Sequence, residues 1–163
     1  MDLIDEMLKL IAALNASGVQ YALCGGLALG VHGFPRATQD IDLLVPENER
    51  QKLLDVARTV GFWIPSGRMP FKAKTPLAMD IWRVSKAVGP QLISLDLIIV
   101  SPALESVWNS RVVVRFSELD CCVVSRDGLI TMKSIAGRFQ DLADIERLRA
   151  DKGEGDADNA SEN

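Results

Sequence analysis

Apolar residues recur at helical spacing at the start of the chain. Over residues 2–16 they form one stripe, which predicts an amphipathic helix with these positions inward: Leu3, Met7, Leu10, Ile11 and Leu14. Gly18 follows as a stop signal. A short apolar run over residues 19–24 then predicts a buried strand ending at Gly25 and Gly26, and a short helix over residues 27–31 ends before the break at residues 33–35.

The pattern then changes to alternation. Residues 39–45 alternate polar and apolar up to Asp42 and become apolar afterwards, which predicts a strand that enters the core. Pro46 and Glu47 open a second helix, and Gly61 lies just past its end. Residues 62–77 contain three prolines, three basic residues and no acid, which predicts a loop-rich stretch with room for one short strand.

The second half of the chain reads as strands followed by helices. Strands are predicted over residues 78–84 and 92–100, joined by a segment whose Gly89-Pro90 pair is a turn signal. Two more β segments are predicted at 111–116 and 121–124. Ser125 is a suitable N-cap for a helix starting near residue 126, and a second helical segment extends to about residue 150.

Length and composition limit the class of protein. The 163 residues suffice for one domain, which we expect over residues 1–150. Residues 151–163 hold no core-forming side chain, so we expect a disordered acidic tail. No apolar run approaches the roughly 18 residues that span a bilayer, and the N-terminus carries acids where a signal peptide carries basic residues. These features predict a cytoplasmic protein without a membrane partner.

Charge and cysteine usage exclude two further classes. The net charge of −4 argues against a broad nucleic-acid-binding surface, although a local basic cleft is compatible with it. The three cysteines and one histidine show no zinc-ligand spacing, so we expect reduced thiols and no zinc.

Two aspartates provide the first candidate chemistry. Asp40 and Asp42 are one residue apart in a predicted strand, so both side chains leave the same face. Such close carboxylates repel each other unless a cation lies between them. Hard oxygen ligands suit Mg²⁺, which takes phosphate oxygens as further ligands. The alternative is an edge strand that displays two solvated acids.

A third aspartate lies in a strongly apolar strand. Burying Asp96 costs several kcal/mol unless it is paired or binds a metal. Its neighbours on the same strand face are Ser94 and Ile98, neither of which is a cation. We therefore interpret Asp96 as a third metal ligand, and a hydrogen-bonded acid at the open end of the sheet is the alternative. Asp80, in the preceding strand, competes with Asp96 for this role.

The glycine pair adds a phosphate-binding feature. Glycines at a strand-to-helix junction let the backbone approach a phosphate, and the helix N-terminus offers free N–H groups to the anion. Gly25 and Gly26 occupy such a junction ahead of Asp40 and Asp42. The order is therefore a phosphate loop, a metal site and a later strand aspartate.

The stretch YALCGGLALGVHGFPRATQDIDLLV resembles the opening motif of the DNA polymerase β-like nucleotidyltransferase superfamily. Within it, Arg36 and Thr38 resemble the AbiEii-type branch, which includes toxins of toxin–antitoxin pairs. The segment MKSIAGRFQDLADIERL resembles the closing motif of that branch through Lys133, Arg138 and Asp141. The resemblance covers roughly residues 17–148. Two departures concern the acceptor: Gly26 stands where serine is common, and the chain is short for such a toxin.

The resemblance implies an α+β fold with a mixed β-sheet flanked by helices. It also implies transfer of a nucleoside monophosphate from an NTP to an acceptor, with two Mg²⁺ ions as cofactors. In that reading Asp40, Asp42 and Asp96 are the catalytic and metal-binding residues. The nucleotide-binding residues are Gly25, Gly26, Arg36, Thr38 and Lys133.

Several alternatives stay open at this point. Lys133 and Arg138 are equally well interpreted as helix-surface charges, with Arg138 pairing to Asp141, and Arg36 as a solvated loop residue. His32 is interpreted as a cap or packed side chain rather than as a catalyst. The acceptor is a tRNA, a protein or a small molecule such as an antibiotic. A weakly active partner-binding module, a cognate antitoxin or toxin partner and a homodimer are further readings that the sequence leaves open.

Overall fold

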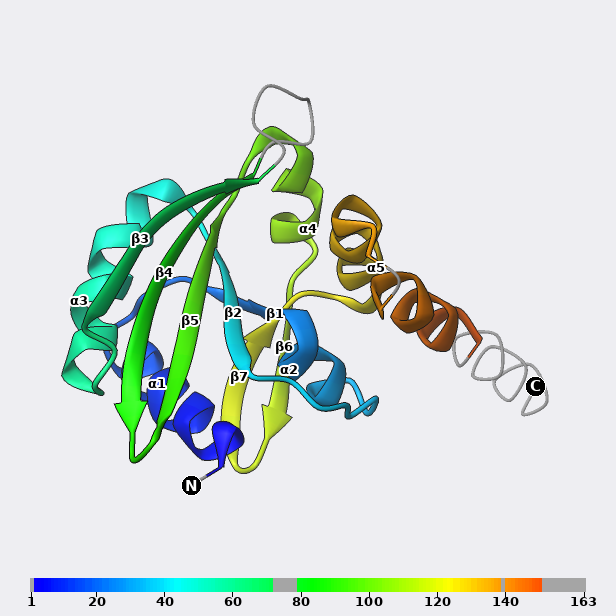
Figure 1. The fold of residues 1–163 in the computed structure, drawn as a ribbon. Coiled ribbons are helices and arrows are strands. Elements are labelled where there is room, and N and C mark those ends of the chain that lie inside the picture. The colour runs from blue at the N-terminus through cyan, green and yellow to red at the C-terminus, as the bar shows by residue number, and fades with distance from the viewer. Residues whose placement is uncertain (1, 72–78, 139, 151–163) are drawn as a thin grey trace.

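A seven-stranded mixed sheet forms the centre of the described part of the chain, which comprises residues 2–71, 79–138 and 140–150 of the computed structural model (Figure 1). The strand order is β3-β4-β5-β2-β1-β7-β6. The pairs β2–β5 and β1–β7 are parallel, and the remaining neighbours are antiparallel. The strands are β1 (Ala22–Cys24), β2 (Asp40–Val45), β3 (Ile64–Phe71), β4 (Met79–Val88), β5 (Gln91–Ile99), β6 (Val112–Phe116) and β7 (Leu119–Val123).

The helices form two groups beside this sheet. One group is α1 (Leu3–Ala16) with α3 (Arg50–Thr59), and the other joins α2 (Gly25–Val31) and α4 (Glu105–Asn109) to α5 (Arg126–Ala136) (Figure 1). Residues 140–150 form a further helical segment after α5. Short 3₁₀ turns precede α3 at Glu47–Glu49 and α4 at Pro102–Leu104. The predicted fold class, a mixed sheet flanked by helices, is confirmed.

Local signals explain where the main helices begin and end. The Asp2 side chain accepts a hydrogen bond from the backbone N–H of Ile4 at the start of α1, and the whole predicted apolar stripe except Leu3 is fully buried. The Ser125 hydroxyl accepts from the Gly128 N–H at the start of α5, as predicted. Gly137, in the left-handed region, ends that helix. These boundaries follow directly from the sequence.

The prediction for residues 62–77 was wrong in its main point. Most of this stretch that the structure describes is the eight-residue strand β3. It lies at the edge of the sheet, where proline is tolerated because one side of the strand needs no hydrogen-bond partner. Its register with β4 also shifts between Pro65 and Gly67. Residues 72–78 lie outside the described residues. They include Lys72 and Lys74, two of the three basic residues of this stretch.

Two smaller differences concern the β4–β5 hairpin and α4. The segment expected to join the two strands is largely part of β4, which continues to Val88, and the reversal occurs at Gly89-Pro90. The short helix α4 has no counterpart in the sequence prediction. The tail at residues 151–163 lies outside the described residues. None of the described helices has the length and apolar character that crossing a bilayer requires.

Candidate active site

One row of side chains crosses four neighbouring strands of the sheet. The register places Cys24 of β1 opposite Asp42 of β2, Asp42 opposite Asp96 of β5, and Asp96 opposite Arg83 of β4. Residues directly opposite each other in a sheet project to the same face. The row therefore brings two predicted aspartates together, and Asp40 joins them because it is two residues from Asp42 on the same strand.

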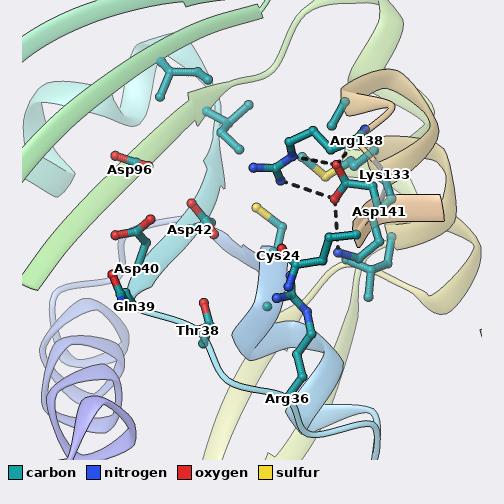
Figure 2. Close-up of a pocket in the computed structure, with 18 of the residues that line it drawn as sticks. Cys24, Arg36, Thr38, Gln39, Asp40, Asp42, Asp96, Lys133, Arg138 and Asp141 are labelled. Atoms are coloured by element: carbon teal, nitrogen blue, oxygen red, sulfur yellow. Dashed lines mark hydrogen bonds and ion pairs between the residues drawn. The ribbon is translucent and has the colours of Figure 1, made fainter. Parts of the chain in front are cut away.

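Asp40, Asp42 and Asp96, here called the acidic cluster, line a single cavity of about 710 Å³. Between the two aspartates of β2, Ile41 is fully buried in the core, as the predicted alternation requires. Figure 2 shows the acidic cluster on one side of the cavity and a group of basic side chains on the other, with Cys24 between them. The volume lies in the range of small-molecule binding pockets.

Arg83 holds the third aspartate. Its Nε lies 2.7 Å from Asp96 Oδ1 and its Nη2 lies 3.0 Å from Asp96 Oδ2, a bidentate ion pair. Nη2 is also 3.9 Å from Asp40 Oδ2. The sequence reasoning missed Arg83 because it looked for a cation on the strand of Asp96 itself. The cation comes instead from the adjacent strand, so the burial of Asp96 is not by itself evidence for a metal.

Asp80 lies outside this arrangement. Its carboxylate pairs with Arg68 of β3, and it does not line the cavity. Asp96, by contrast, faces Asp42 directly across the β2–β5 ladder. The geometry therefore favours Asp96 over Asp80 as the third acid of the site.

Burial and mutual repulsion dominate the electrostatics of the acidic cluster. Burial, followed by the charges of Asp96 and Asp40, raises the pKa of Asp42 to about 7. Burial and Asp96 also raise the pKa of Asp40, while Arg83 opposes that rise. A raised carboxyl pKa means that the anionic form is less favourable in the site than in water. Arg83 therefore compensates the cluster only in part.

The donor chemistry of the acidic cluster fits a hard divalent cation such as Mg²⁺. Within residues 2–71, 79–138 and 140–150, however, no three His, Cys, Asp or Glu side chains are already arranged to hold a metal ion. The ion pair with Arg83 already engages both oxygens of Asp96. Asp40 and Asp42 are the acids whose raised pKa values call for a cation.

The two glycines pack tightly against the site. Gly25 has a φ of +68°, and a Cβ atom there would lie 2.8 Å from Asp42 Cγ and closer still to Oδ2. A Cβ atom on Gly26 would lie 2.8 Å from both Cβ and Oγ1 of Thr38. The absence of side chains at both positions thus lets the start of α2 approach Asp42 and Thr38 directly.

At the other side of the cavity, three cations meet two buried acids. Lys133 Nζ donates to Asp144 Oδ2 at 3.0 Å and lies 3.7 Å from Asp141 Oδ1. Arg36 Nε lies 3.2 Å from Asp144, and Arg138 donates to both oxygens of Asp141. We call Arg36, Lys133 and Arg138 the basic cluster. Arg36 lies in the α2–β2 loop, Lys133 lies in α5, and Arg138 directly follows Gly137.

This arrangement shows how Lys133 and Arg138, which the sequence allowed to be helix-surface charges, are placed. The pairing of Arg138 with Asp141 is confirmed, and its hydrogen bonds lower the pKa of Asp141 even though burial acts in the opposite direction. Lys133 is buried rather than on the helix surface. Asp144, which the sequence reasoning left out, pairs with both Lys133 and Arg36. The sequence did offer one indication of its role, because Asp144 lies in the same closing motif as Lys133, Arg138 and Asp141.

The remaining candidates have structural roles. His32 ends α2, and its Nε2 lies 2.8 Å from the carbonyl oxygen of Val124, in agreement with a packed cap. Cys24 is fully buried, and burial together with Asp42 raises its pKa well above the ordinary value. The Cys24 thiol is therefore not suited to proton transfer at neutral pH.

No protein-family model and no curated protein matches the sequence. Solved structures do match it. One is a protein from Thermotoga maritima with a provisional nucleotidyltransferase assignment, at 14% identity and a TM-score of 0.60, covering 93% of this chain and 92% of that chain. Another is ANT(2'')-Ia in complex with adenylyl-2''-tobramycin, at 14% identity and a TM-score of 0.58, covering 93% and 90%.

A third match is JHP933 from Helicobacter pylori, at 18% identity and a TM-score of 0.52, covering 88% of this chain and 63% of that chain. At these identities the likeness establishes the fold alone. The chain therefore has the fold of nucleotidyltransferases, as the resemblance of its motifs implied.

Proposed function

We propose that the protein transfers a nucleoside monophosphate from an NTP to an acceptor and releases pyrophosphate. The observation that carries this proposal is the convergence of Asp40, Asp42 and Asp96 in one cavity whose opposite side holds the basic cluster. In a metal-bound triphosphate, the metal ion would bind to the carboxylates and the phosphate oxygens would contact the cations. The fold supports the same reaction class.

The acidic cluster would hold the metal. Asp40 and Asp42 would bind two Mg²⁺ ions, and Asp96 would complete the ion nearer the acceptor once Arg83 releases it. When bound, Mg²⁺ neutralises charge on the phosphate oxygens and aligns the attacking and leaving groups. The carboxylates themselves orient the site, and Asp96 is the candidate general base.

The bonds that change follow from this placement. The acceptor hydroxyl oxygen attacks the α-phosphorus, and its proton passes to a carboxylate oxygen of Asp96. The bond between the α-phosphorus and the oxygen that bridges it to the β-phosphate breaks, and pyrophosphate leaves with that electron pair. Positioning and charge neutralisation supply most of the rate of such a transfer.

The start of α2 and the basic cluster would hold the triphosphate. The backbone N–H groups of Gly25 and Gly26 would face the β- and γ-phosphates, with Thr38 packed behind Gly26. Arg36 and Lys133 would contribute positive charge. The Lys133 ammonium has three N–H donors and makes one short hydrogen bond, to Asp144, so donors remain for a phosphate oxygen.

The resemblance to the AbiEii-type branch favours an RNA or protein acceptor and a role in a toxin–antitoxin pair. The motif residues Arg36, Lys133 and Arg138 come from separate islands of sequence and meet in one ion-pair cluster, which supports this assignment. The small-molecule alternative is favoured by the match to ANT(2'')-Ia, which covers 90% of that chain. The structure of ANT(2'')-Ia holds adenylyl-2''-tobramycin.

A labelling experiment tests the reaction. The protein is incubated with Mg²⁺ and NTPs labelled at the α- or γ-phosphate, in the presence of total RNA, of cell protein, of tobramycin or of the enzyme alone. We expect the α-label on an acceptor and the γ-label in pyrophosphate. Asp42→Asn should reduce transfer by about a hundredfold or more, because it removes a carboxylate from the metal site.

Asp80→Asn is the matched control, since Asp80 lies on the neighbouring strand outside the cavity. It should leave transfer at the wild-type rate. Equal transfer by wild type and Asp42→Asn, or γ-label on the acceptor, would contradict the proposed reaction.

A further inference from the structure

The Arg83 guanidinium lies beside two carboxylates of the acidic cluster, those of Asp96 and Asp40. It reaches this position from β4, directly across the ladder from Asp96. Its two N–H contacts cover both oxygens of Asp96, and Nη2 lies 3.9 Å from Asp40. Arg83 thus contacts two of the three carboxylates at once, and about a third of its side chain stays exposed in the cavity.

A guanidinium and a divalent cation compete for the same carboxylate, because both are cations that bind its oxygens. The planar fork of arginine matches a carboxylate in bidentate fashion, and its charge persists at every pH that proteins tolerate. Hydrogen bonding to Asp96 raises the pKa of Arg83 further. A metal ion bound to both Asp96 oxygens would displace these N–H groups and would also be repelled by the cation beside it.

We infer that Arg83 is a positioning residue that competes with the divalent metal for Asp96. The inference rests on the proposed function, because it takes the acidic cluster as the metal site. Without nucleotide, Asp40 and Asp42 alone are open to the metal, which then binds weakly. Asp96 joins the centre only when Arg83 releases it.

The nucleotide should make that release easier. An NTP carries enough negative charge to compensate both the metal and a nearby guanidinium, so metal and nucleotide should bind cooperatively. In the metal-free protein Arg83 would then compensate part of the negative charge of the acidic cluster. It would also favour the metal–nucleotide complex over the free metal.

The neighbouring pair Arg68–Asp80 offers a matched comparison. It too joins an arginine and an aspartate on adjacent strands of the same sheet, but it lies outside the cavity. Removing Arg68 changes the net charge by the same amount as removing Arg83. Of these two arginines, Arg83 is the one that contacts the acidic cluster.

The test titrates the full, metal-free chain with Mn²⁺ in the absence of nucleotide, measuring free Mn²⁺ by electron paramagnetic resonance. Arg83→Gln should bind Mn²⁺ at least about tenfold more tightly than wild type, because the competing cation is gone. Arg83→Lys keeps the charge but loses the bidentate fork, so its affinity should lie between the two. Arg68→Gln should bind like wild type.

Each outcome decides the inference. Equal, measurable affinity of wild type and Arg83→Gln would overturn the competition while leaving the proposed reaction intact. No Mn²⁺ binding by any variant would overturn both. Wild-type affinity in Arg83→Lys would overturn the bidentate competition even if Arg83→Gln binds more tightly. If circular dichroism shows Arg83→Gln to be unfolded, the comparison of Arg83→Lys with wild type carries the test alone.

Discussion

The Asp42 carboxyl group lies against the backbone of Gly25 and has two carboxylate neighbours, Asp96 across the β2–β5 ladder and Asp40 two residues along its own strand. Because burial and these neighbours raise its pKa to about 7, the metal-free site holds this group part-protonated near neutral pH. A divalent cation would favour the charged form and release the proton. The close approach of Gly25 fixes where that carboxylate points.

Gly25→Ala should therefore destabilise the fold and disturb Asp42. The substitution combines a positive φ with a Cβ atom inside contact distance of the carboxylate, and we expect it to lower the free energy of unfolding by about 3 kcal/mol. Gly18→Ala is the control, since Gly18 has nearly the same φ, +66°, with no atom near its added Cβ. It should cost about 1 kcal/mol. Urea denaturation measures both, and equal losses would contradict the packing of Gly25 on Asp42.

At the residue scale, the sequence predicted the acids better than their partners. Alternation along one strand shows that Asp40 and Asp42 share a face, and an acid amid apolar residues identifies Asp96. Arg83 could not be found this way, because its position opposite Asp96 depends on the register between two strands. That register is set by the β4–β5 hairpin, whose length the sequence pattern underestimated.

At the scale of elements, one ion-pair network ties three segments together at the basic side of the cavity. Asp144, in the helical residues 140–150, accepts a hydrogen bond from Lys133 of α5 and pairs with Arg36 of the α2–β2 loop. Arg36 and Lys133 line the same cavity as Gly25 and Gly26 at the start of α2. The last helical segment is attached to the site through charge as well as through apolar packing.

Asp144→Asn should destabilise the protein by about 3 kcal/mol, because it leaves the buried Lys133 without its nearest counter-charge. Asp120→Asn is the matched control. The Asp120 side chain is 66% exposed and pairs with Arg115, whereas that of Asp144 is 5% exposed. Exposed pairs contribute little, so the control should cost less than about 1 kcal/mol. Similar costs by chemical denaturation would show that the network does not stabilise the fold.

The elements themselves were predictable where local signals dominate. The helix α1 follows from its apolar stripe and its Asp2 cap, and α5 from Ser125 and Gly137. The strand β3 was not predictable, because prolines read as loop unless the strand is known to lie at a sheet edge. Edge position is a property of the whole sheet and leaves no local trace.

For the whole molecule, the essential feature is the separation of charge across one cavity. The net charge of −4 says little about it, since the acidic cluster and the basic cluster lie on opposite sides of the cavity, each with partners of opposite charge. The parallel pairing of β2 with β5 brings the acids together, and the α2–β2 loop, α5 and the residue after Gly137 bring the bases. A ligand that carries a metal at one end and phosphates at the other matches both sides.

The most direct test of this account is thermal unfolding of the full chain with Mg²⁺ and each of the four NTPs in turn. A ligand at a hundred times its Kd stabilises the folded state by about 2.7 kcal/mol, so the Tm should rise by about 5 °C or more with at least one NTP. Asp42→Asn should lose that rise and Asp80→Asn should keep it. No rise with any NTP, or an equal rise in Asp42→Asn, would contradict a metal–nucleotide site at the acidic cluster.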